Sequence, residues 1–291
     1  MNLSIKSPSP IGLLLLSILS VQFGSALAKS LFDDLGPWGV VFLRVAFSAL
    51  ILFAVGRPQF NTTVRQNFKA VLTYGIVLTT MNSLFYAAID RIPLGIAISL
   101  EFTGPLGLSV LKSQRWLDGL WAVLALVGII LLTPITGAAL DPLGMFFALA
   151  AGICWAFYIL LAAKVGSILP GVEGLTWGLI VGTIMLLPIG IVTTGGALLN
   201  PRLLGLGAGV ALLSSMLPYS LEMMALRSLP IKVFGVMLSL EPMVGVVAGF
   251  LILGETLSAR SLIACLLVSV AAAGAAQFQS APPAPPLPPA G

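Results

Sequence analysis

Three glutamates and one arginine stand inside long apolar stretches of this sequence. They are Glu101, Glu222, Glu241 and Arg44. A charge in the middle of a membrane-crossing helix costs about 2.5 to 3.5 kcal/mol, so such side chains face a bundle interior, pair or take up a proton. Carboxyl groups in that setting could exchange a proton for a substrate amine. Arg44 could bind a substrate carboxylate through two parallel hydrogen bonds, or could simply neutralise a glutamate.

Glu101 and Glu241 each stand beside an expected helix break. Pro105 follows Glu101 by four residues, and Pro242 follows Glu241 directly. Proline lacks an N–H and clashes with the carbonyl four residues earlier, which frees backbone carbonyls near both glutamates. At membrane depth, freed carbonyls are tolerated where they line a cavity or bind a polar ligand. We therefore predict that both glutamates bind protons or substrate; the structural alternative is a hydrogen-bonded glutamate at a plain kink.

Polar and aromatic side chains form stripes on several apolar segments. Ser215, Tyr219 and Glu222 follow a spacing of i, i+4 and i+7, which places them on one helix face, and Pro218 loosens the same turn. Other segments present Gln22 with Ser25, Asn82 with Tyr86, and Trp155 with Tyr158. These stripes predict a cavity for a small amphiphilic ligand, with Tyr219, Asn82, Tyr86 and Tyr158 in its lining. Hydrogen bonding between helices is the alternative.

The elements that must position these residues are membrane-crossing helices. Apolar residues make up 58% of the chain and charged residues 8%, against about 25% charged in soluble domains. Ten apolar segments of suitable length are 11–30, 38–56, 70–89, 94–111, 117–134, 143–163, 174–194, 203–226, 232–253 and 259–277. We expect an all-α polytopic protein in a lipid bilayer, which sets aside soluble enzymes and nucleic-acid partners. Histidine is absent and the two cysteines have no second ligand nearby, so neither a metal nor a cofactor is expected.

The loop charges predict the orientation of these segments. With the N-terminus inside, the cytoplasmic cations are Lys6, Arg57, Arg65, Lys69, Lys112, Arg115, Lys164, Arg227 and Lys232, and the opposite set is Lys29, Arg91, Arg202 and Arg260. This excess on one side predicts that both termini are cytoplasmic. Lys29 and Lys164 lie close enough to segment ends to snorkel. The first segment also resembles a cleavable signal peptide, but its loss would leave an odd number of segments and destroy the internal repeat.

Two halves of the chain repeat each other at a nearly constant offset. The matches are Ala28-Lys29 with Ala163-Lys164, Trp38-Gly39 with Trp177-Gly178, AIDRIP (88–93) with ALRSLP (225–230), and SLE (99–101) with SLE (239–241). A five-helix repeat is odd, so the second copy must be inverted in the membrane, as in secondary transporters. We predict a first repeat over residues 1–135, an inverted second repeat over 143–277 and a disordered proline-rich tail over 278–291.

At these motifs the sequence resembles the EamA family of the drug/metabolite transporter superfamily. The motifs are IPLGIAISLEFTGP (92–105), LPYSLEM (217–223), SLEP (239–242) and LGETL (253–257). More narrowly, they are similar to those of inner-membrane threonine/homoserine exporters of bacteria. The resemblance implies export of small amino acids, by proton antiport, with no enzymatic activity. The proline-rich tail departs from the family pattern.

Several alternatives remain open on the sequence alone. Efflux of cationic drugs would also suit aromatic residues near a buried glutamate, an intramembrane enzyme could use paired carboxylates, and a passive channel would ignore the proton gradient. No phosphate-binding loop of the G-x-x-x-x-G-K-[ST] type occurs, so ATP hydrolysis is excluded. Gly245 and Gly249 form a G-x-x-x-G pair that could pack the two halves together or form a homodimer.

Overall fold

The computed structural model describes residues 9–111, 117–132, 141–226 and 237–277, which form helices joined by turns and loops and contain no β-strand. The helices are α1 (Pro10–Lys29), α2 (Phe32–Gly56), α3 (Thr62–Gln66), α4 (Phe68–Ile89), α5 (Leu94–Glu101), α6 (Thr103–Leu111), α7 (Leu117–Leu132), α8 (Pro142–Ile168), α9 (Glu173–Thr194), α10 (Pro201–Ala211), α11 (Leu217–Leu226), α13 (Glu241–Leu253) and α14 (Ala259–Gln277). A 3₁₀ turn (Gly195–Leu199) follows α9, and a π-helical turn (Leu212–Met216) joins α10 to α11. The predicted tail lies outside the described residues, as do the loop cations Lys6, Lys112, Arg115, Arg227 and Lys232.

Six helical stretches are long and apolar enough to cross a membrane. They are Pro10–Lys29, Phe32–Gly56, Phe68–Ile89, Pro142–Ile168, Glu173–Leu199 and Pro201–Glu222. Four shorter apolar helical stretches are Leu94–Leu108, Gly119–Leu131, Glu241–Leu253 and Ala259–Gly274. Large apolar side chains also cover the outer faces, with Leu50 61% and Val192 83% exposed. An apolar surface of this kind is suited to contact with lipid rather than with water.

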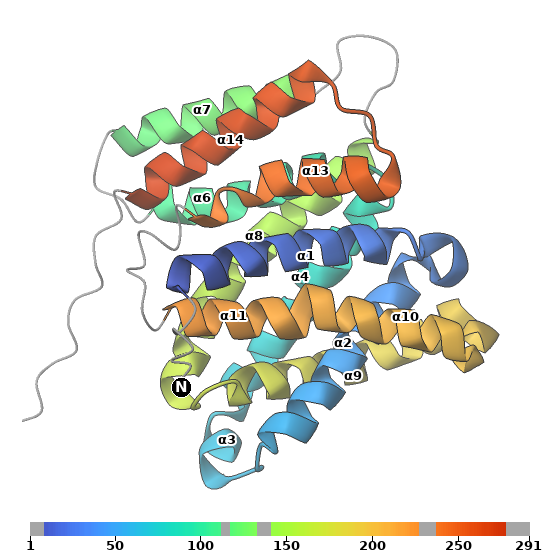
Figure 1. Ribbon diagram of the computed structural model, residues 1–291. Helices are drawn as coiled ribbons and strands as arrows, with labels where there is room; N and C mark the ends of the chain where they lie inside the picture. The colour runs from blue at the N-terminus through green and yellow to red at the C-terminus, as the bar shows by residue number, and fades with distance from the viewer. Residues whose placement is uncertain (1–8, 112–116, 133–140, 227–236, 278–291) are drawn as a thin grey trace, which may run out of the picture.

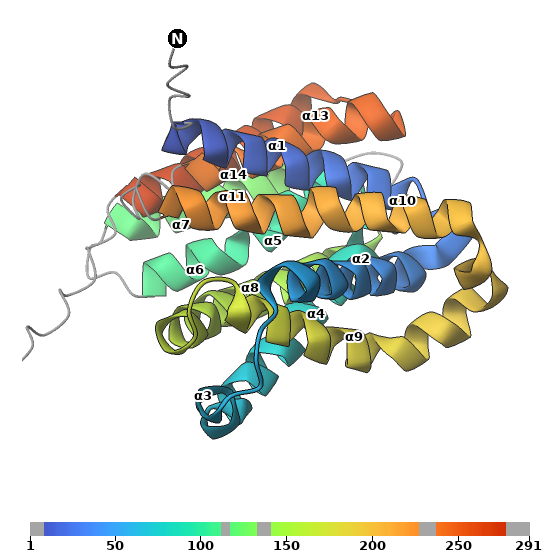
Figure 2. The ribbon, with the colours of Figure 1, turned by 60° about the horizontal axis from the view of Figure 1, so that its bottom comes forward.

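The helices pack as a bundle in which distant parts of the chain are neighbours (Figures 1 and 2). The rod formed by α10, the π turn and α11 lies alongside α1, and α7 pairs with α14 at one edge of the bundle. Helix α4 packs against α8 and α9, α2 against α9 and α10, and α13 against α1 and α5. The first and second halves of the chain are therefore interleaved, not side by side.

Three helices begin at the same local signal, a capping side chain followed by proline. The side chains of Ser9, Asp141 and Asn200 accept hydrogen bonds from backbone N–H groups at 3.0, 2.9 and 3.0 Å in the first turns of α1, α8 and α10. The next residue is proline in each case, and proline fits the first helical position because no helical partner exists for an N–H there. These helix starts are thus encoded locally.

Four of the expected segments differ in detail from the structure. The segment 94–111 divides at Phe102 into α5 and α6, and the segment 203–226 contains the π turn. Helix α2 begins at Phe32, earlier than expected, and bends at Gly36, whose φ of 65° favours a residue without a side chain. In the segment 232–253, residues 232–236 lie outside the described residues and α13 begins at Glu241.

The G-x-x-x-G pair packs α13 within the chain. A Cβ built on Gly245 would collide with the side chain of Ile98 in α5, and one built on Gly249 would collide with the Glu255 carboxylate. From the other side, a Cβ on Gly95 of α5 would collide with Val246. Of the two uses expected for this pair, the structure has the close packing of the two halves of the chain.

Candidate functional site

Both paired glutamates lie where a helix is interrupted. Glu101 is the last residue of α5, and α6 begins two residues later at Thr103. Glu241 is the first residue of α13, directly after a turn at Ser239 and Leu240. Pro105 and Pro242 fall within the first turns of α6 and α13, where a missing N–H costs little. The two prolines therefore accompany helix starts in the middle of apolar segments.

The carbonyl group of Glu101 packs against α8. A Cβ built on Gly152 would collide with the Glu101 carbonyl oxygen, and one built on Gly104 would collide with the carbonyl oxygen of Gly152. Only glycine allows the two backbones to approach this closely. The expectation of a freed carbonyl that lines a cavity is therefore corrected at Glu101: this oxygen faces a neighbouring backbone.

Arg44 is buried, at 4% exposure, and lies between the two halves of the chain. Its Nε donates to Ser215 Oγ and its Nη2 to the carbonyl oxygen of Ser214, both at 2.8 Å. Its guanidinium carbon lies 5.3 Å from the ring centre of Tyr86, a cation–π distance. Across the described residues the ion pairs are Lys29 with Glu255 and Arg91 with Asp141, so Arg44 does not pair directly with a glutamate.

Pro218 explains why a backbone carbonyl is available to Arg44. In an α-helix the carbonyl of Ser214 would accept from the N–H of residue 218, which proline lacks. The chain forms a π turn over Leu212–Met216 here, and Arg44 supplies the missing donor. This corrects the expectation of one regular face for Ser215, Tyr219 and Glu222, because the turn changes the spacing between Ser215 and the residues of α11. π turns inside α-helices are frequent at functional sites.

Helix α1 provides a hydrogen-bond partner to Glu222 and another to Glu241. Ser17 Oγ donates to Glu222 Oε1 at 2.8 Å and lies 3.1 Å from the carbonyl oxygen of Pro218. Gln22 Nε2 donates to Glu241 Oε2 at 3.3 Å. The carboxylate of Glu101 has no hydrogen bond to any described residue. Gln22 had been noted in a polar stripe, whereas a serine in an apolar helix gave no distinctive signal for Ser17.

Tyr219 connects these groups into one cluster. It lies within electrostatic range of Arg44 and of all three glutamates. Arg44 is also within range of Glu101, and Glu241 within range of Glu101 and Glu222. We call Arg44, Glu101, Glu222, Glu241 and Tyr219 the central polar cluster; it contains one cationic and three carboxyl groups.

The remaining predicted residues differ in their relation to this cluster. Tyr86 is buried beneath Arg44, and Tyr158 stacks on Tyr74 at 5.6 Å while lying within electrostatic range of Tyr219 and Glu222. Asn82 is also buried, but its Nδ2 donates to the Leu78 carbonyl of its own helix at 2.7 Å. The structure therefore brings the tyrosines to the cluster and gives the Asn82 amide a local role.

A second group of charges lies at the end of the bundle where α1 ends. Lys29 Nζ is 2.8 Å from Glu255 Oε1 and 3.1 Å from the carbonyl oxygen of Ile92. The Glu255 carboxylate also accepts the N–H of Leu94, the first residue of α5, at 3.0 and 3.1 Å. We call Lys29, Glu255 and these two backbone groups the terminal charge cluster. Lys29 lies at the end of its segment, where a snorkelling side chain was expected, and there it pairs with Glu255, whose motif had marked only the broad family.

The glycines of the second half position Glu255. Gly254 ends α13 in the left-handed conformation, with φ of 65°, and its N–H donates to the carbonyl of Gly249. The N–H of Glu255 donates to the same oxygen at 3.1 Å. This turn brings the carboxylate back against its own helix, into the space left by the missing side chain of Gly249. A glycine before the glutamate is thus what directs its side chain toward α5.

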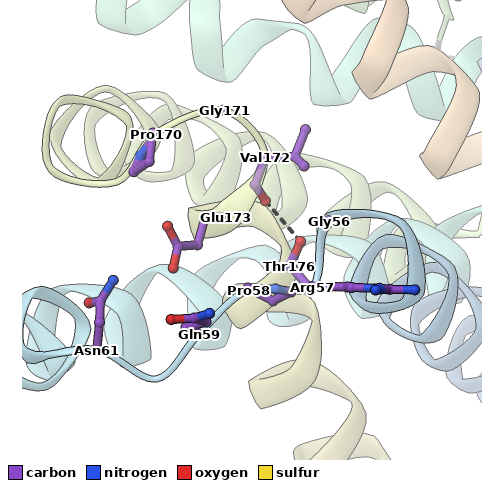
Figure 3. Close-up of a pocket in the computed structure, with 10 residues that line it drawn as sticks. All are labelled: Gly56, Arg57, Pro58, Gln59, Asn61, Pro170, Gly171, Val172, Glu173 and Thr176. Carbon is purple, nitrogen blue, oxygen red and sulfur yellow. Dashed lines mark hydrogen bonds between the residues drawn. The ribbon is translucent and has the colours of Figure 1, made fainter.

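Two surface hollows lie away from the central polar cluster. One of about 480 Å³ is formed by the chain between α2 and α3 and by the turn between α8 and α9. Figure 3 shows the carboxylate of Glu173 pointing into it near Gln59 and Asn61, while Thr176 donates to the Val172 carbonyl at 2.9 Å. None of the predicted site residues lines it. In the described part of the chain, no three His, Cys, Asp or Glu side chains converge as a metal site would require.

Comparison with known proteins assigns the chain to a family. Residues 142–276 match the EamA-like transporter family. The threonine/homoserine exporters RhtA of Salmonella typhimurium (strain LT2) and Escherichia coli (strain K12) are 42% and 41% identical over 267 residues, covering 91% of this chain and 90% of theirs. A solved crystal structure that is 18% identical covers 90% of this chain and 95% of its own, with a TM-score of 0.61, which shows a shared fold. The chain therefore belongs to the EamA-like transporter family.

Proposed function

We propose that ten helical segments cross the membrane as two inverted five-helix repeats, over residues 1–135 and 143–277. The equivalent elements would be α1 and α8, α2 and α9, α4 and the α10–α11 rod, α5–α6 and α13, and α7 and α14. A two-fold relation requires each contact to recur when equivalent elements are exchanged. The contact of α4 with α8 corresponds to that of α11 with α1, and the contact of α4 with α9 to that of α10 with α2. The contact of α5 with α8 likewise corresponds to that of α13 with α1. This interchange supports the repeat.

The first helix is needed for this arrangement. Helix α1 supplies the partners of Glu222, Glu241 and Glu255, through Ser17, Gln22 and Lys29. Its removal as a signal peptide would leave those three carboxylates without these partners. We therefore propose that α1 is retained, that both termini are cytoplasmic in a bacterial inner membrane, and that the terminal charge cluster lies at the opposite, outer end.

We further propose that the protein exports small amino acids such as threonine and homoserine. The observation that carries this proposal is Arg44, which is buried and held by Ser214 and Ser215 but has no ion pair with a carboxylate among the described residues. A guanidinium fixed in this way suits a substrate carboxylate, and the nearby glutamates suit its ammonium group. The printed names of the relatives support the same substrate class. A fixed cation in the site disfavours the alternative of cationic drug efflux.

Coupling to protons and alternating access complete the proposal. One repeat would rock against the other around the central polar cluster, and exchange of a proton against the substrate ammonium would drive export. The interleaved contacts between the halves, and a cluster that combines three carboxyl groups with one cation, support this mechanism. A passive channel would need neither feature.

The test is export of labelled threonine and homoserine from cells that overproduce the protein, with and without a protonophore. We expect wild-type export to need the gradient and Glu101→Gln to abolish it at equal membrane levels. Glu173→Gln makes the same change in the hollow of Figure 3 and serves as the matched control, with export retained. Absence of wild-type export would remove the substrate assignment. Wild-type rates in Glu101→Gln would return this residue to a structural role.

A further inference from the structure

Glu241 differs from Glu222 in the partner that α1 gives it. Its carboxylate accepts a hydrogen bond from the side-chain amide of Gln22, whereas Glu222 accepts one from the hydroxyl of Ser17. Gln22 is itself buried, at 3% exposure, and its Oε1 has no hydrogen-bond partner among the described residues. A buried amide oxygen without a partner carries a free-energy cost, so a use for it is to be expected.

An amide can serve a carboxyl group in both of its protonation states. The nitrogen donates to a carboxylate, and after rotation about the terminal bond of the side chain the oxygen accepts from a carboxylic acid. Gln22 offers both atoms from a fixed place on α1, and Glu241 lies at the start of α13 beside a turn. The contact between α1 and α13 can therefore persist when Glu241 gains or loses a proton.

The titratable groups around Glu241 also support a proton-binding role for its carboxyl group. The titratable groups within its range are Glu101 of α5, and Glu222 and Tyr219 of α11, all of which are acidic. Helix α14 also packs on α13, and its Cys265 is hydrogen-bonded to Ser99 Oγ at 3.2 Å. The cation of the cluster, Arg44, acts on Glu101 instead.

We propose that Glu241 is the carboxyl group that carries the proton, that Gln22 is its positioning residue, and that Glu101 acts with Arg44 on the substrate. This division of roles rests on the proton-coupled exchange proposed above. A Glu241 oxygen takes up a proton from water on one side of the membrane, and the Gln22 amide rotates to accept from the new O–H group. Release of the proton to water on the other side restores the original hydrogen bond.

The experiment reads protonation directly and needs no substrate. Protein reconstituted in lipid is stepped from alkaline to acidic solution, and infrared difference spectra record the carbonyl stretch of newly formed carboxylic acids. We expect one component of the wild-type spectrum to be lost in Glu241→Gln. The same component should shift in frequency in Gln22→Met, which removes the hydrogen bond while keeping side-chain length. Gln66→Met makes that change at an exposed position of α3 and should leave the spectrum unchanged.

Each outcome decides between the assignments. A Glu241→Gln spectrum that superimposes on that of the wild type would overturn the role of Glu241, and an unshifted component in Gln22→Met would overturn the role of Gln22. Because Gln22→Met keeps Glu241 in place, the proposal stays testable even if Glu241→Gln fails to fold. Failure of threonine and homoserine export in cells would remove the substrate assignment but leave these spectra, and hence the proton assignment, standing.

Discussion

The terminal charge cluster and the central polar cluster use charged side chains in opposite ways. At the end of the bundle, Lys29 and Glu255 are 2.8 Å apart; Lys29 also bonds the Ile92 carbonyl just before α5, and Glu255 bonds the N–H of Leu94 at its start. In the centre, Arg44 bonds a serine hydroxyl and a freed carbonyl, and the Glu101 carboxylate has no hydrogen bond to a described residue. Charges that the protein satisfies by itself hold helices together. Charges that have no direct ion pair among the described residues are the ones that we propose bind a ligand or a proton.

The difference has a physical basis in desolvation. Bringing a charge into an apolar interior is costly unless a partner of opposite sign compensates for it. The terminal charge cluster removes this cost within the chain, at side-chain exposures of 20% for Lys29 and 17% for Glu255. The central polar cluster removes it only in part, so a substrate with both a carboxylate and an ammonium group could lower the free energy of the site on binding.

The sharpest test of the comparison exchanges the type of cation in both clusters. Arg44→Lys keeps the charge but loses the planar guanidinium. In the wild type, that group bonds Ser214 and Ser215 through two nitrogens and keeps its third nitrogen for the substrate. We expect export of homoserine to fall by about 100-fold at equal membrane levels. Lys29→Arg changes a cation that has its carboxylate partner already and serves as the control, with export within a few-fold of wild type. Equal export by the two variants would contradict the distinction between the clusters.

A smaller effect, on stability rather than transport, is expected at the terminal charge cluster. Glu255→Gln keeps an acceptor for the Leu94 N–H but leaves Lys29 without its carboxylate. We expect a loss of about 2 kcal/mol in stability, because hydrogen bonds to charged groups contribute about 1.5 to 3 kcal/mol. Thermal unfolding of the purified protein in detergent measures it. Combining Glu255→Gln with Lys29→Gln should recover part of the loss, and a fully additive double variant would show that the pair is not coupled.

The sequence was sufficient for features that depend on local chemistry. Apolar stretches near the length of a membrane span mark the helices, and proline beside Glu101 and Glu241 marks the interruptions. The burial of Arg44 and of Glu241, at 4% and 8% exposure, follows from their position within apolar segments. These features need only neighbouring residues, so they can be read without knowledge of the packing.

Partners that lie far apart in the chain could not be predicted in the same way. Ser17 and Glu222 are 205 residues apart, and Lys29 and Glu255 are 226 apart. Nothing local distinguishes a serine that bonds a distant glutamate from one that bonds its own helix. The π turn before α11 was missed for a related reason, since the loss of one N–H at Pro218 can be met by a kink, a wide turn or an outside donor such as Arg44. Packing between the halves of the chain decides among these.

The smallest effect is expected at the ion pair of Arg91 and Asp141, which are 2.9 Å apart and 40% and 34% exposed. The hydrogen bond from Arg91 holds the pKa of the Asp141 carboxyl below its usual value, so the folded protein favours the ionised form. Its contribution to stability is therefore present above the usual aspartate pKa of about 3.9 and is lost as the pH falls through the lower folded value. Asp141→Asn keeps the cap on α8, because asparagine caps as well as aspartate. Thermal unfolding should show a small deficit for this variant at neutral pH that disappears in acid; a deficit as large as that of Glu255→Gln would mean that exposure does not separate the two ion pairs.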